Sequence, residues 1–511
     1  MKNIFFNRKF IAIILSIAFT GLMFPTISKL PLGYIFIAVS YLLLFNFCIS
    51  YAATFLRRIS FILIPILLFL STIAAYFFAT YRIKINHELI FLLLETNTGE
   101  AGEFINPELV TVGLTGLLFS LLMGYLIKNC TGKIQFKLVI IPLLALIPMN
   151  IGLSKFRHNP RVRILRPAVA TKYAFPYCVV NSFANFTKHY IAYKTQGEVT
   201  SSALLESSAT LQSEPLKLIF IIGESARADR FQLNGYKRAT NPLLMKEKNV
   251  ITFGAIKSFS AYTRISVPAM ITPTIFSKPE VSTGSFLALF KKHGFETTWL
   301  SANDRFTGKD TPTTRAIGEV ENKLFRNRFT NASYGEFTDD MFLEPVKSLL
   351  TDENKNQAIA IHTRGSHAHY AARYTKLYQK FMPDNYGSEM NIEKVNNAYD
   401  NSILFTDAFI KSIIDLVRDE NAVVIYSSDH GESLGENGRF SHGDPKVKEQ
   451  REVPLIIWYS DKYEELNPKI VALLKEQVGK KLSHDVLFPW TVNLGGISLI
   501  NTDQPVLVPA S

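Results

Sequence analysis

The sequence predicts an α-helical membrane domain with five transmembrane helices, followed by an α/β domain built on a mostly parallel sheet. Two observations predict this division. Apolar residues make up 48% of the 511 residues, and the longest apolar runs are concentrated in the first third of the chain. From about Leu216 onward, short apolar stretches alternate with helical ones, which is typical of a sheet covered by helices.

Five runs are candidates for membrane-spanning helices, because a helix needs roughly 20 apolar residues to cross a bilayer. They lie at Phe10–Ile27, Leu32–Phe55, Ile59–Tyr81, Leu109–Ile127 and Leu138–Leu153. A cleaved signal peptide is the alternative interpretation of the first run, but the four runs behind it favour a span. The membrane domain is therefore expected to cover residues 1–154.

The distribution of basic residues predicts the orientation of these spans, because cytoplasmic loops carry an excess of lysine and arginine. The segments on one side of the membrane contain Lys2, Arg8, Lys9, Arg57, Arg58, Lys128, Lys133 and Lys137, and the loops on the other side contain Lys29, Arg82 and Lys84. The N-terminus is therefore expected in the cytoplasm. An odd number of spans then places the second domain outside, in the periplasm of a Gram-negative cell, and makes the chain a multi-pass protein of the inner membrane.

The chain is basic, with a net charge of +12, but nothing in the sequence indicates nucleic-acid binding. It contains no recognition module and no interleaving of aromatic and basic residues. A basic cluster directly after the last span is instead expected to lie on anionic lipid headgroups. This cluster consists of Lys155, Arg157, Arg161, Arg163 and Arg166. The three cysteines, Cys48, Cys130 and Cys178, provide no disulfide framework for the outer domain.

Two further segments are expected at the membrane surface. Ile85–Thr96 is predicted to form a short amphipathic helix at the interface, with a solvated acidic loop as the alternative for this region. Residues 155–213 are expected to form an interfacial helix and a linker, because the segment is first basic and aromatic and then rich in serine, threonine and glutamate. The remaining residues, 214–511, form the predicted α/β domain.

Five strands and two helices are predicted in the α/β domain. The strands lie at Lys217–Ile222, Thr297–Ser301, Ala358–His362, Val423–Ser427 and Leu455–Tyr459. The helices lie at Ser285–His293, which Gly294 ends, and at Asn396–Arg418, whose apolar residues recur at helical spacing.

Four residues are candidates for one metal site. Glu224 follows the first predicted strand, and Asp429-His430 follow the fourth, where Gly431 permits a sharp turn. Thr263 is expected at the start of a helix. Two carboxylates, an imidazole and a hydroxyl would make a tetrahedral zinc site in which the threonine is also the nucleophile. The alternatives are a helix N-cap contact for Glu224 and an ordinary surface or strand position for Thr263.

Histidines in two glycine-containing loops are candidates for substrate binding. His367 follows the third predicted strand, and His442 lies in a loop expected at the same end of the sheet. Each could bind a substrate phosphate or a second zinc ion, as could His369, and a surface histidine is the alternative for each. His362 is interpreted as a structural strand residue, and His484 as a packing residue ahead of an apolar run.

Seven segments carry a resemblance to a known family. They are Ile222–Asp229, Leu233–Tyr236, Thr240–Pro242, Thr263–Pro268, His362–His367, Asn397–Ser402 and Ser428–Ser433. In these segments the chain resembles the phosphoethanolamine transferases, the group that includes the lipid A enzymes and the mobile colistin-resistance enzymes. The resemblance runs in order through the whole outer domain, and the membrane part matches in layout. It implies five N-terminal spans and a periplasmic domain of the alkaline phosphatase and sulfatase superfamily.

The resemblance also implies roles for individual residues. The catalytic zinc would be held by Glu224, Thr263, Asp429 and His430, and Thr263 would become phosphorylated. His367 and His442 would contact the phosphate or a further zinc ion. The donor-lipid motif of the family falls on Thr96 and Glu100.

Three features depart from the family pattern. Leu92 stands where the family has an asparagine in the loop that contacts the donor lipid. The loop at Asn303–Lys309 lacks the cysteines of many members, so the resemblance leaves the role of Lys309 open. The disulfides common in the family are absent from the outer domain as well.

The reaction that the resemblance implies is transfer of phosphoethanolamine from phosphatidylethanolamine to lipopolysaccharide, with release of diacylglycerol. Zinc would favour the alkoxide of Thr263, and an acceptor oxygen would then attack the phosphorylated threonine. Lipid A phosphate, Kdo, a core heptose and periplasmic glucan all remain as acceptors. The added amine would lower the attraction of the surface for cationic peptides such as polymyxins.

Three other functions compete with this interpretation. The nearest is a phosphoglycerol transferase or phosphodiesterase of the same superfamily. A sulfatase is disfavoured because its Cys/Ser-x-Pro-x-Arg signature is absent around Thr263. A non-catalytic membrane binding protein would be favoured if one of the four candidate ligands were missing, and all four are present.

Overall fold

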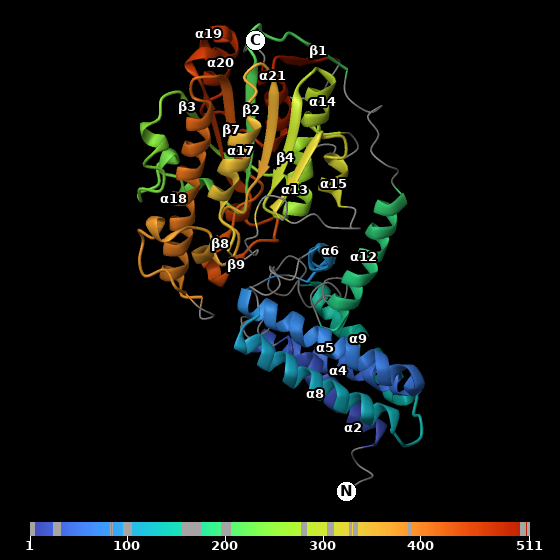
Figure 1. Ribbon diagram of the computed structural model, residues 1–511. Coiled ribbons are helices and arrows are strands. Elements are labelled where there is room, and N and C mark those ends of the chain that lie inside the picture. Colours follow the sequence, from blue (N-terminus) through green and yellow to red (C-terminus); the bar gives the residue numbers. More distant parts are fainter. Residues whose placement is uncertain are drawn as a thin grey trace. The chain divides into compact units, whose positions relative to one another are not determined.

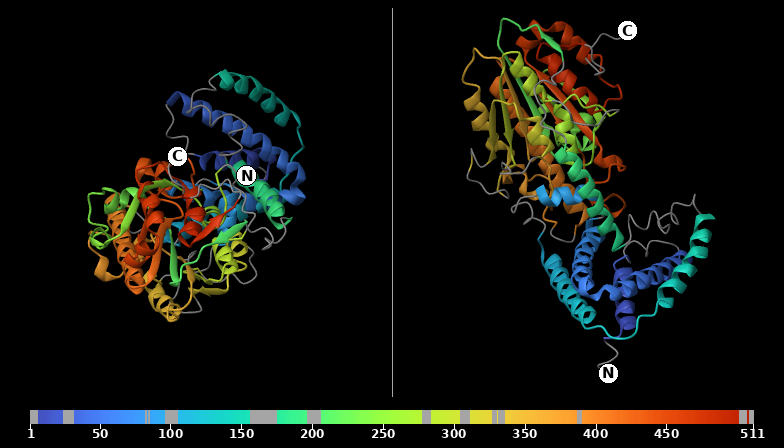
Figure 2. Two further views of the ribbon diagram at one scale, coloured as in Figure 1. Left: turned by 90° about the horizontal axis from the view of Figure 1, so that it is seen from above. Right: turned by 90° about the vertical axis from the view of Figure 1, so that its right-hand side faces the viewer.

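The chain forms two compact units in the computed structural model. The structure describes residues 6–23, 32–81, 83, 85–95, 105–155, 175–195, 206–276, 284–303, 311–326, 330, 336–386, 390–500 and 507. The first unit combines Met1–Leu94 with Phe104–Gln196, and the second combines Glu95–Glu103 with Gly197–Ser511. The helices of the first unit and the sheet of the second can be followed in Figures 1 and 2.

A helix occupies each of the five apolar runs that the sequence predicts to span the membrane. These helices are α2 (Arg8–Gly21), α4 (Leu32–Ala53), α5 (Arg57–Tyr81), α8 (Pro107–Lys128) and α9 (Lys137–Lys155). Two helical stretches of the described residues, Ala38–Tyr81 and Pro107–Lys128, are long and apolar enough to cross a membrane, and Lys137–Leu146 is a shorter apolar helix. Five helices are therefore present, and their number as membrane spans remains a prediction.

Small residues on one face of α8 allow it to pack closely against α5. Gly116, Ser120 and Gly124 recur every four residues and are buried. A Cβ at Gly116 would lie 2.9 Å from Cγ2 of Thr72, and one at Gly124 would lie 2.8 Å from Cγ of Pro65. Close backbone approach through small residues is the usual way in which helices associate in a bilayer, where burial of large apolar side chains gives no advantage.

Two shorter helices complete the described part of the first unit. They are α6 (His87–Glu95) and α12 (Tyr177–Thr195), whose rings pair as His87 with His189 and Phe91 with Phe186. α6 coincides with the amphipathic helix predicted after residue 85, while its place at the membrane interface remains a prediction. Cys48, Cys130 and Cys178 are buried and free.

The second unit is built on a seven-stranded sheet with the order β3-β10-β7-β2-β6-β4-β5 within the described residues. The strands are β2 (Leu216–Gly223), β3 (Val250–Lys257), β4 (Glu296–Ser301), β5 (Asn322–Phe325), β6 (Gln357–His362), β7 (Asn421–Ser428) and β10 (Glu452–Tyr459). β7, β2, β6, β4 and β5 are parallel, whereas β10 is antiparallel to both β7 and β3. The prediction of a mostly parallel sheet is confirmed, as are its five strands; β3 and β5 were not predicted.

Helices cover both faces of this sheet, so its central strands are apolar throughout. All eight residues of β2 are buried, with alternate side chains on opposite faces. One face carries α13 (Thr263–Ile271), α14 (Phe286–Lys292) and α21 (Leu487–Leu494), and the other carries α17 (Leu343–Leu349) and α18 (Ile392–Val417). α14 and α18 match the two predicted helices.

The remaining elements of the second unit are short. They are the helices α15 (Pro312–Ala316), α19 (Asp461–Leu466) and α20 (Pro468–Lys475) and the strands β1 (Ser207–Ala209), β8 (Ser433–Leu434), β9 (Phe440–Ser441) and β11 (Ile497–Leu499). β1 pairs antiparallel with β11 and so ties the end of the linker to the C-terminal part of the domain.

Candidate active site

The carboxyl ends of β2 and β7 bring three candidate ligands together. The two strands are parallel neighbours in register, with Gly223 opposite Ser428. The residues that follow them, Glu224 and Asp429, therefore leave the sheet at the same edge. Gly223 is required there because a Cβ would lie 2.5 Å from the hydroxyl oxygen of Tyr426.

Gly431 has a different role from the one the sequence suggested. Its φ does not lie in the left-handed region, so the turn after His430 needs no special backbone conformation. A Cβ at this position would lie 2.2 Å from the carbonyl oxygen of Glu449. The glycine is required by close approach of another backbone segment rather than by a sharp turn.

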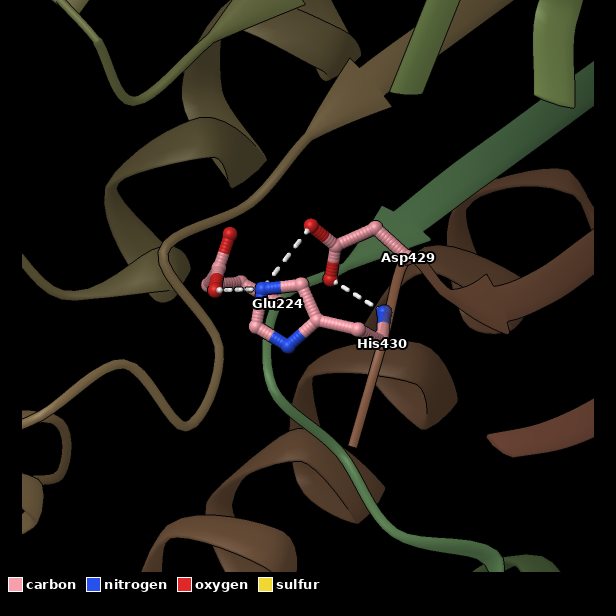
Figure 3. Close-up of side chains that lie close together, drawn as sticks. All are labelled: Glu224, Asp429 and His430. Atoms are coloured by element: carbon pink, nitrogen blue, oxygen red, sulfur yellow. Dashed lines mark hydrogen bonds and ion pairs between the residues drawn. The ribbon is translucent and has the colours of Figure 1, made fainter. Parts of the chain in front are cut away.

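Glu224, Asp429 and His430 point toward one another, as Figure 3 shows. Nε2 of His430 lies 3.4 Å from Oε1 of Glu224 and 3.5 Å from Oδ2 of Asp429. Thr263 begins α13 and places its Oγ1 3.1 Å from Oε2 of Glu224 and 3.1 Å from Nε2 of His430. All four side chains proposed from the sequence as zinc ligands thus meet at one point.

These four donors fit a tetrahedral cation site. Zinc binds oxygen and nitrogen donors at about 2.0–2.2 Å, which places the corners of a tetrahedron about 3.3–3.6 Å apart. The four distances given above are 3.1–3.5 Å, with Oε1 of Glu224 nearest to His430 and Oε2 nearest to Thr263. In addition, Oδ2 of Asp429 is buried and accepts no hydrogen bond from the described residues. A buried carboxylate oxygen is costly without a partner, so the residues present suit a divalent cation.

The imidazole of His430 is oriented for metal binding. Its Nδ1 lies 2.9 Å from the carbonyl oxygen of Gly431, to which it donates, and this leaves the Nε2 lone pair facing the carboxylates. Burial lowers the pKa of His430, but the carboxylates of Asp429 and Glu224 outweigh this effect and raise the pKa overall. The same two charges that favour a proton here would favour a metal ion in its place.

Two further histidines lie at this edge of the sheet. The ring of His442 lies 4.1 Å from that of His430 and 6.4 Å from that of His367, measured between centroids. Nδ1 of His442 lies 3.3 Å from Oε2 of Glu432, a fully buried carboxyl whose pKa burial raises to about 8. His367 and His442 are therefore close enough to the candidate ligands to face a shared substrate.

The two other histidines weighed from the sequence beside His367 differ in burial. His362 is buried at the end of β6, whereas His369 is exposed with a φ of 63°. Thr96, Glu100 and Lys309 lie outside the described residues.

Two residues that sequence reasoning did not select hold the site in place. The hydroxyl of Tyr262 donates to the carbonyl oxygen of Gly443 at 2.6 Å, linking the segment of Thr263 to the loop of His442. His484, interpreted from the sequence as a packing residue, hydrogen-bonds to the backbone of Phe259 and of Ser428. Neither contact has a signal in the sequence, because both join segments that only the tertiary fold brings together.

Known proteins share both units of this chain. Residues 217–497, more than half of the chain, match the Sulfatase family model, and residues 41–190 match the model for phosphoethanolamine transferase EptA/EptB. Phosphoethanolamine transferase EptA of Escherichia coli (strain K12) is 28% identical over 455 residues, which cover 83% of this chain and 80% of that protein. Phosphatidylethanolamine transferase Mcr-1 of Escherichia coli is 28% identical over 473 residues, covering 86% and 85%.

A solved structure has the same fold over nearly the whole chain. It is the integral membrane protein lipooligosaccharide phosphoethanolamine transferase A from Neisseria meningitidis, with a TM-score of 0.78, 24% identity, and coverage of 97% of this chain and 96% of that one. The family models and the relatives agree with the motifs read from the sequence. The chain belongs to the phosphoethanolamine transferases of the sulfatase family.

Proposed function

We propose that the protein transfers phosphoethanolamine from phosphatidylethanolamine to lipopolysaccharide, with Thr263 as the nucleophile. The observation that carries this proposal is the position of Oγ1 of Thr263, 3.1 Å from both Oε2 of Glu224 and Nε2 of His430. This hydroxyl faces a carboxylate and an imidazole that are both buried candidate ligands. Such a position suits nucleophilic catalysis. The names of the relatives support the headgroup, and the donor lipid and acceptor are inferred from them.

Zinc bound at these residues would supply Lewis-acid chemistry and favour the ionised form of a bound hydroxyl. The hydroxyl of Thr263 donates to Oε2 of Glu224, which is therefore placed to receive its proton. Oγ1 then forms a bond to phosphorus, the bond from phosphorus to the glycerol oxygen breaks, and diacylglycerol leaves with a proton. His367 and His442 would bind the phosphoryl oxygens and offset their charge. Phosphoethanolamine is thereby left on Thr263.

The second half of the reaction returns the enzyme to its starting state. An oxygen of the acceptor, either a hydroxyl or a phosphate of lipid A or of a core sugar, attacks the same phosphorus. The bond from phosphorus to Oγ1 breaks, and Thr263 regains its proton. Two separate displacements at one residue predict ping-pong kinetics.

The location of the protein follows from the same proposal. We place residues 1–154 in the inner membrane as five spans, residues 155–213 at its surface as an interfacial helix and linker, and residues 214–511 in the periplasm as the catalytic domain. Two membrane-length apolar stretches and the integral membrane relative support this placement. Thr96 and Glu100 are proposed to contact the donor lipid.

The test is mass spectrometry of the purified full-length protein after incubation with phosphatidylethanolamine that carries a deuterated ethanolamine. We expect the labelled phosphoethanolamine mass on the peptide that contains Thr263. Thr263→Ser should keep the adduct, because it retains the hydroxyl, and Thr263→Ala should lose it. A glycerol-phosphate adduct, formed only with phosphatidylglycerol, would indicate the phosphoglycerol transferase instead. A wild-type protein without adduct, together with a fully active Thr263→Ala variant, would refute the proposal.

A further inference from the structure

His484 joins the two segments from which the site is built. It is 1% exposed and lies in a short 3₁₀ turn, His484–Val486, directly ahead of α21. The backbone N–H of Phe259, four residues before Thr263, lies 3.2 Å from its Nδ1. Its Nε2 lies 3.1 Å from the carbonyl oxygen of Ser428, the residue before Asp429. One imidazole thus bridges the nucleophile segment and the carboxyl end of β7.

The two hydrogen bonds determine the protonation state of this ring. A backbone N–H can only donate, so Nδ1 must carry a lone pair, and a carbonyl oxygen can only accept, so Nε2 must carry the proton. His484 is therefore neutral and holds a single tautomer. Burial lowers the pKa of His484 to about 3, in agreement with a ring that stays neutral at physiological pH.

The next residue, Asp485, anchors the other end of the nucleophile helix. Its Oδ1 accepts a hydrogen bond of 2.9 Å from the N–H of Phe276, five residues after α13 ends at Ile271. The rings of Phe259 and Phe276 lie 4.8 Å apart, so the segments before and after α13 meet beside the 484–485 pair. The ring of Phe259 also packs edge-on against that of His484. Two adjacent side chains therefore hold both ends of the helix that begins with Thr263.

We propose that His484 and Asp485 are positioning residues, which bracket α13 and fix Oγ1 of Thr263 against the ligands at the end of β7. This inference rests on the proposed function, because it assigns the pair a role in the attack by Thr263. Misplacement of a reacting group by about 1 Å costs about 100-fold in rate. Hydrogen bonds to the backbone of Phe259 and Phe276, on either side of α13, limit such displacement. A residue that served only for packing would need no hydrogen bonds to these segments.

Two variants of His484 separate its two hydrogen bonds. Asparagine places an oxygen near the position of Nδ1, so His484→Asn keeps the acceptor for Phe259 and loses the donor to Ser428. Glutamine places an amide nitrogen near the position of Nε2, so His484→Gln keeps the donor and loses the acceptor. A matched control is Ser460→Ala, which removes a buried hydrogen bond to the N–H of Ala422 at the opposite end of the same strand β7.

The experiment measures adduct formation on Thr263 in a single turnover, per zinc-loaded molecule, and amide hydrogen exchange of the peptides covering residues 257–276. We expect His484→Gln and Asp485→Ala, which removes the acceptor for Phe276, to slow adduct formation about 10–100-fold and to speed exchange in these peptides. His484→Asn, which keeps the bond to Phe259 and loses the one to Ser428, should slow adduct formation less than His484→Gln does, and Ser460→Ala should change neither readout. All three tryptophans (Trp299, Trp458 and Trp490) lie buried in the second unit, so their fluorescence checks that each variant is folded.

The possible results distinguish the inference from the proposed function. If the wild-type protein forms no adduct, the proposed function fails. Unchanged hydrogen exchange in His484→Gln would then also overturn the inference that His484 helps to position α13. If the wild type forms the adduct while folded His484→Gln and Asp485→Ala match its rate and exchange, only the inference is overturned. Equal slowing by Ser460→Ala would overturn it as well, because the loss would then reflect general stability.

Discussion

Strand β2 has a buried charge at each end, and the surroundings of the two charges differ. At its amino end, Nζ of Lys217 donates to the carbonyl oxygens of Asp352 and Lys355 and to Oε1 of Gln357, at 2.7, 2.9 and 3.0 Å. All three ammonium protons are thereby used. At its carboxyl end, Glu224 meets a second carboxylate, and Oδ2 of Asp429 accepts no hydrogen bond from the described residues.

This difference separates structural charges from functional ones. A buried charge whose hydrogen bonds are all made costs little and needs no further ligand. A buried carboxylate that lacks a partner is retained only where something else compensates it, and such groups are concentrated at functional sites. Both ends of β2 are equally buried, so burial alone does not distinguish them. Both oxygens of Glu224 accept hydrogen bonds, from Oγ of Ser225 and Oγ1 of Thr263, so the distinction lies in the neighbouring Oδ2 of Asp429, which accepts none from the described residues.

The largest expected effect is that of Asp429→Asn, which lies at the carboxyl end of β7 beside Glu224. Loss of one carboxylate ligand should lower the rate of adduct formation on Thr263 by about 1,000-fold or more. The metal-free protein should melt at the same temperature as the wild type or higher, because asparagine keeps an oxygen that can accept from the N–H groups of Ser225 and His430 while a buried charge is removed. Single-turnover mass spectrometry and tryptophan fluorescence of metal-free protein measure the two quantities. A clear loss of stability without metal would mean that Asp429 is a structural charge after all.

The second prediction is the opposite result, a loss of stability without a loss of rate, for a change at the amino end of β2. Lys217→Met leaves three acceptors without their donor and should lower the free energy of unfolding by about 2–4 kcal/mol. The rate of adduct formation per folded, zinc-loaded molecule should stay within about twofold of the wild type, because the change lies at the far end of the strand. Thermal unfolding followed by tryptophan fluorescence measures the first effect. A large loss of rate in folded protein would break the distinction between the two ends.

The smallest expected effect, over the range from pH 7 to pH 5, is a pH dependence of stability that belongs to His484, beside the carboxyl end of β7. His484 has a folded pKa of about 3, whereas an unfolded histidine titrates near about 6.5. The unfolded chain therefore binds this proton first as the pH falls. The stability contributed by the neutral ring is complete above about pH 6.5 and declines toward pH 3, by about 1.4 kcal/mol per pH unit.

A comparison with His484→Gln isolates this contribution, because other titrating groups are common to both proteins. Between pH 7 and pH 5 the melting temperature of the wild type should fall further than that of the variant. Equal falls would show that His484 is already protonated in the folded protein, which its hydrogen bonds exclude.

Much of this architecture could be predicted because the relevant signals are local. Buried parallel strands such as β2 and β7 are continuous apolar runs, and the polar residues that follow parallel neighbours meet at one edge of the sheet. From that rule alone, Glu224 and Asp429 can be predicted to lie close together, even though the conformation of the loops is unknown. The edge strand β3 was missed because it is only half buried, and β5 because it has four residues.

The parts that could not be predicted depend on contacts between distant segments. His484 lies 225 positions from Phe259 and 56 from Ser428, and nothing in the C-terminal sequence indicates where its turn will lie. The role of Gly431 could not be read either, because it depends on the approach of Glu449. The roles of Thr96, Glu100 and Lys309 stay predictions.

The most direct test of the central claim is anomalous diffraction at the zinc edge from crystals of the full-length protein grown with zinc. We expect a peak about 2.0–2.2 Å from one donor atom of each of Glu224, Thr263, Asp429 and His430. A second peak near His367 and His442 would add a further ion without changing this claim. Absence of density among the four donors, or a zinc ion there with Oγ1 of Thr263 outside its coordination sphere, would contradict the claim.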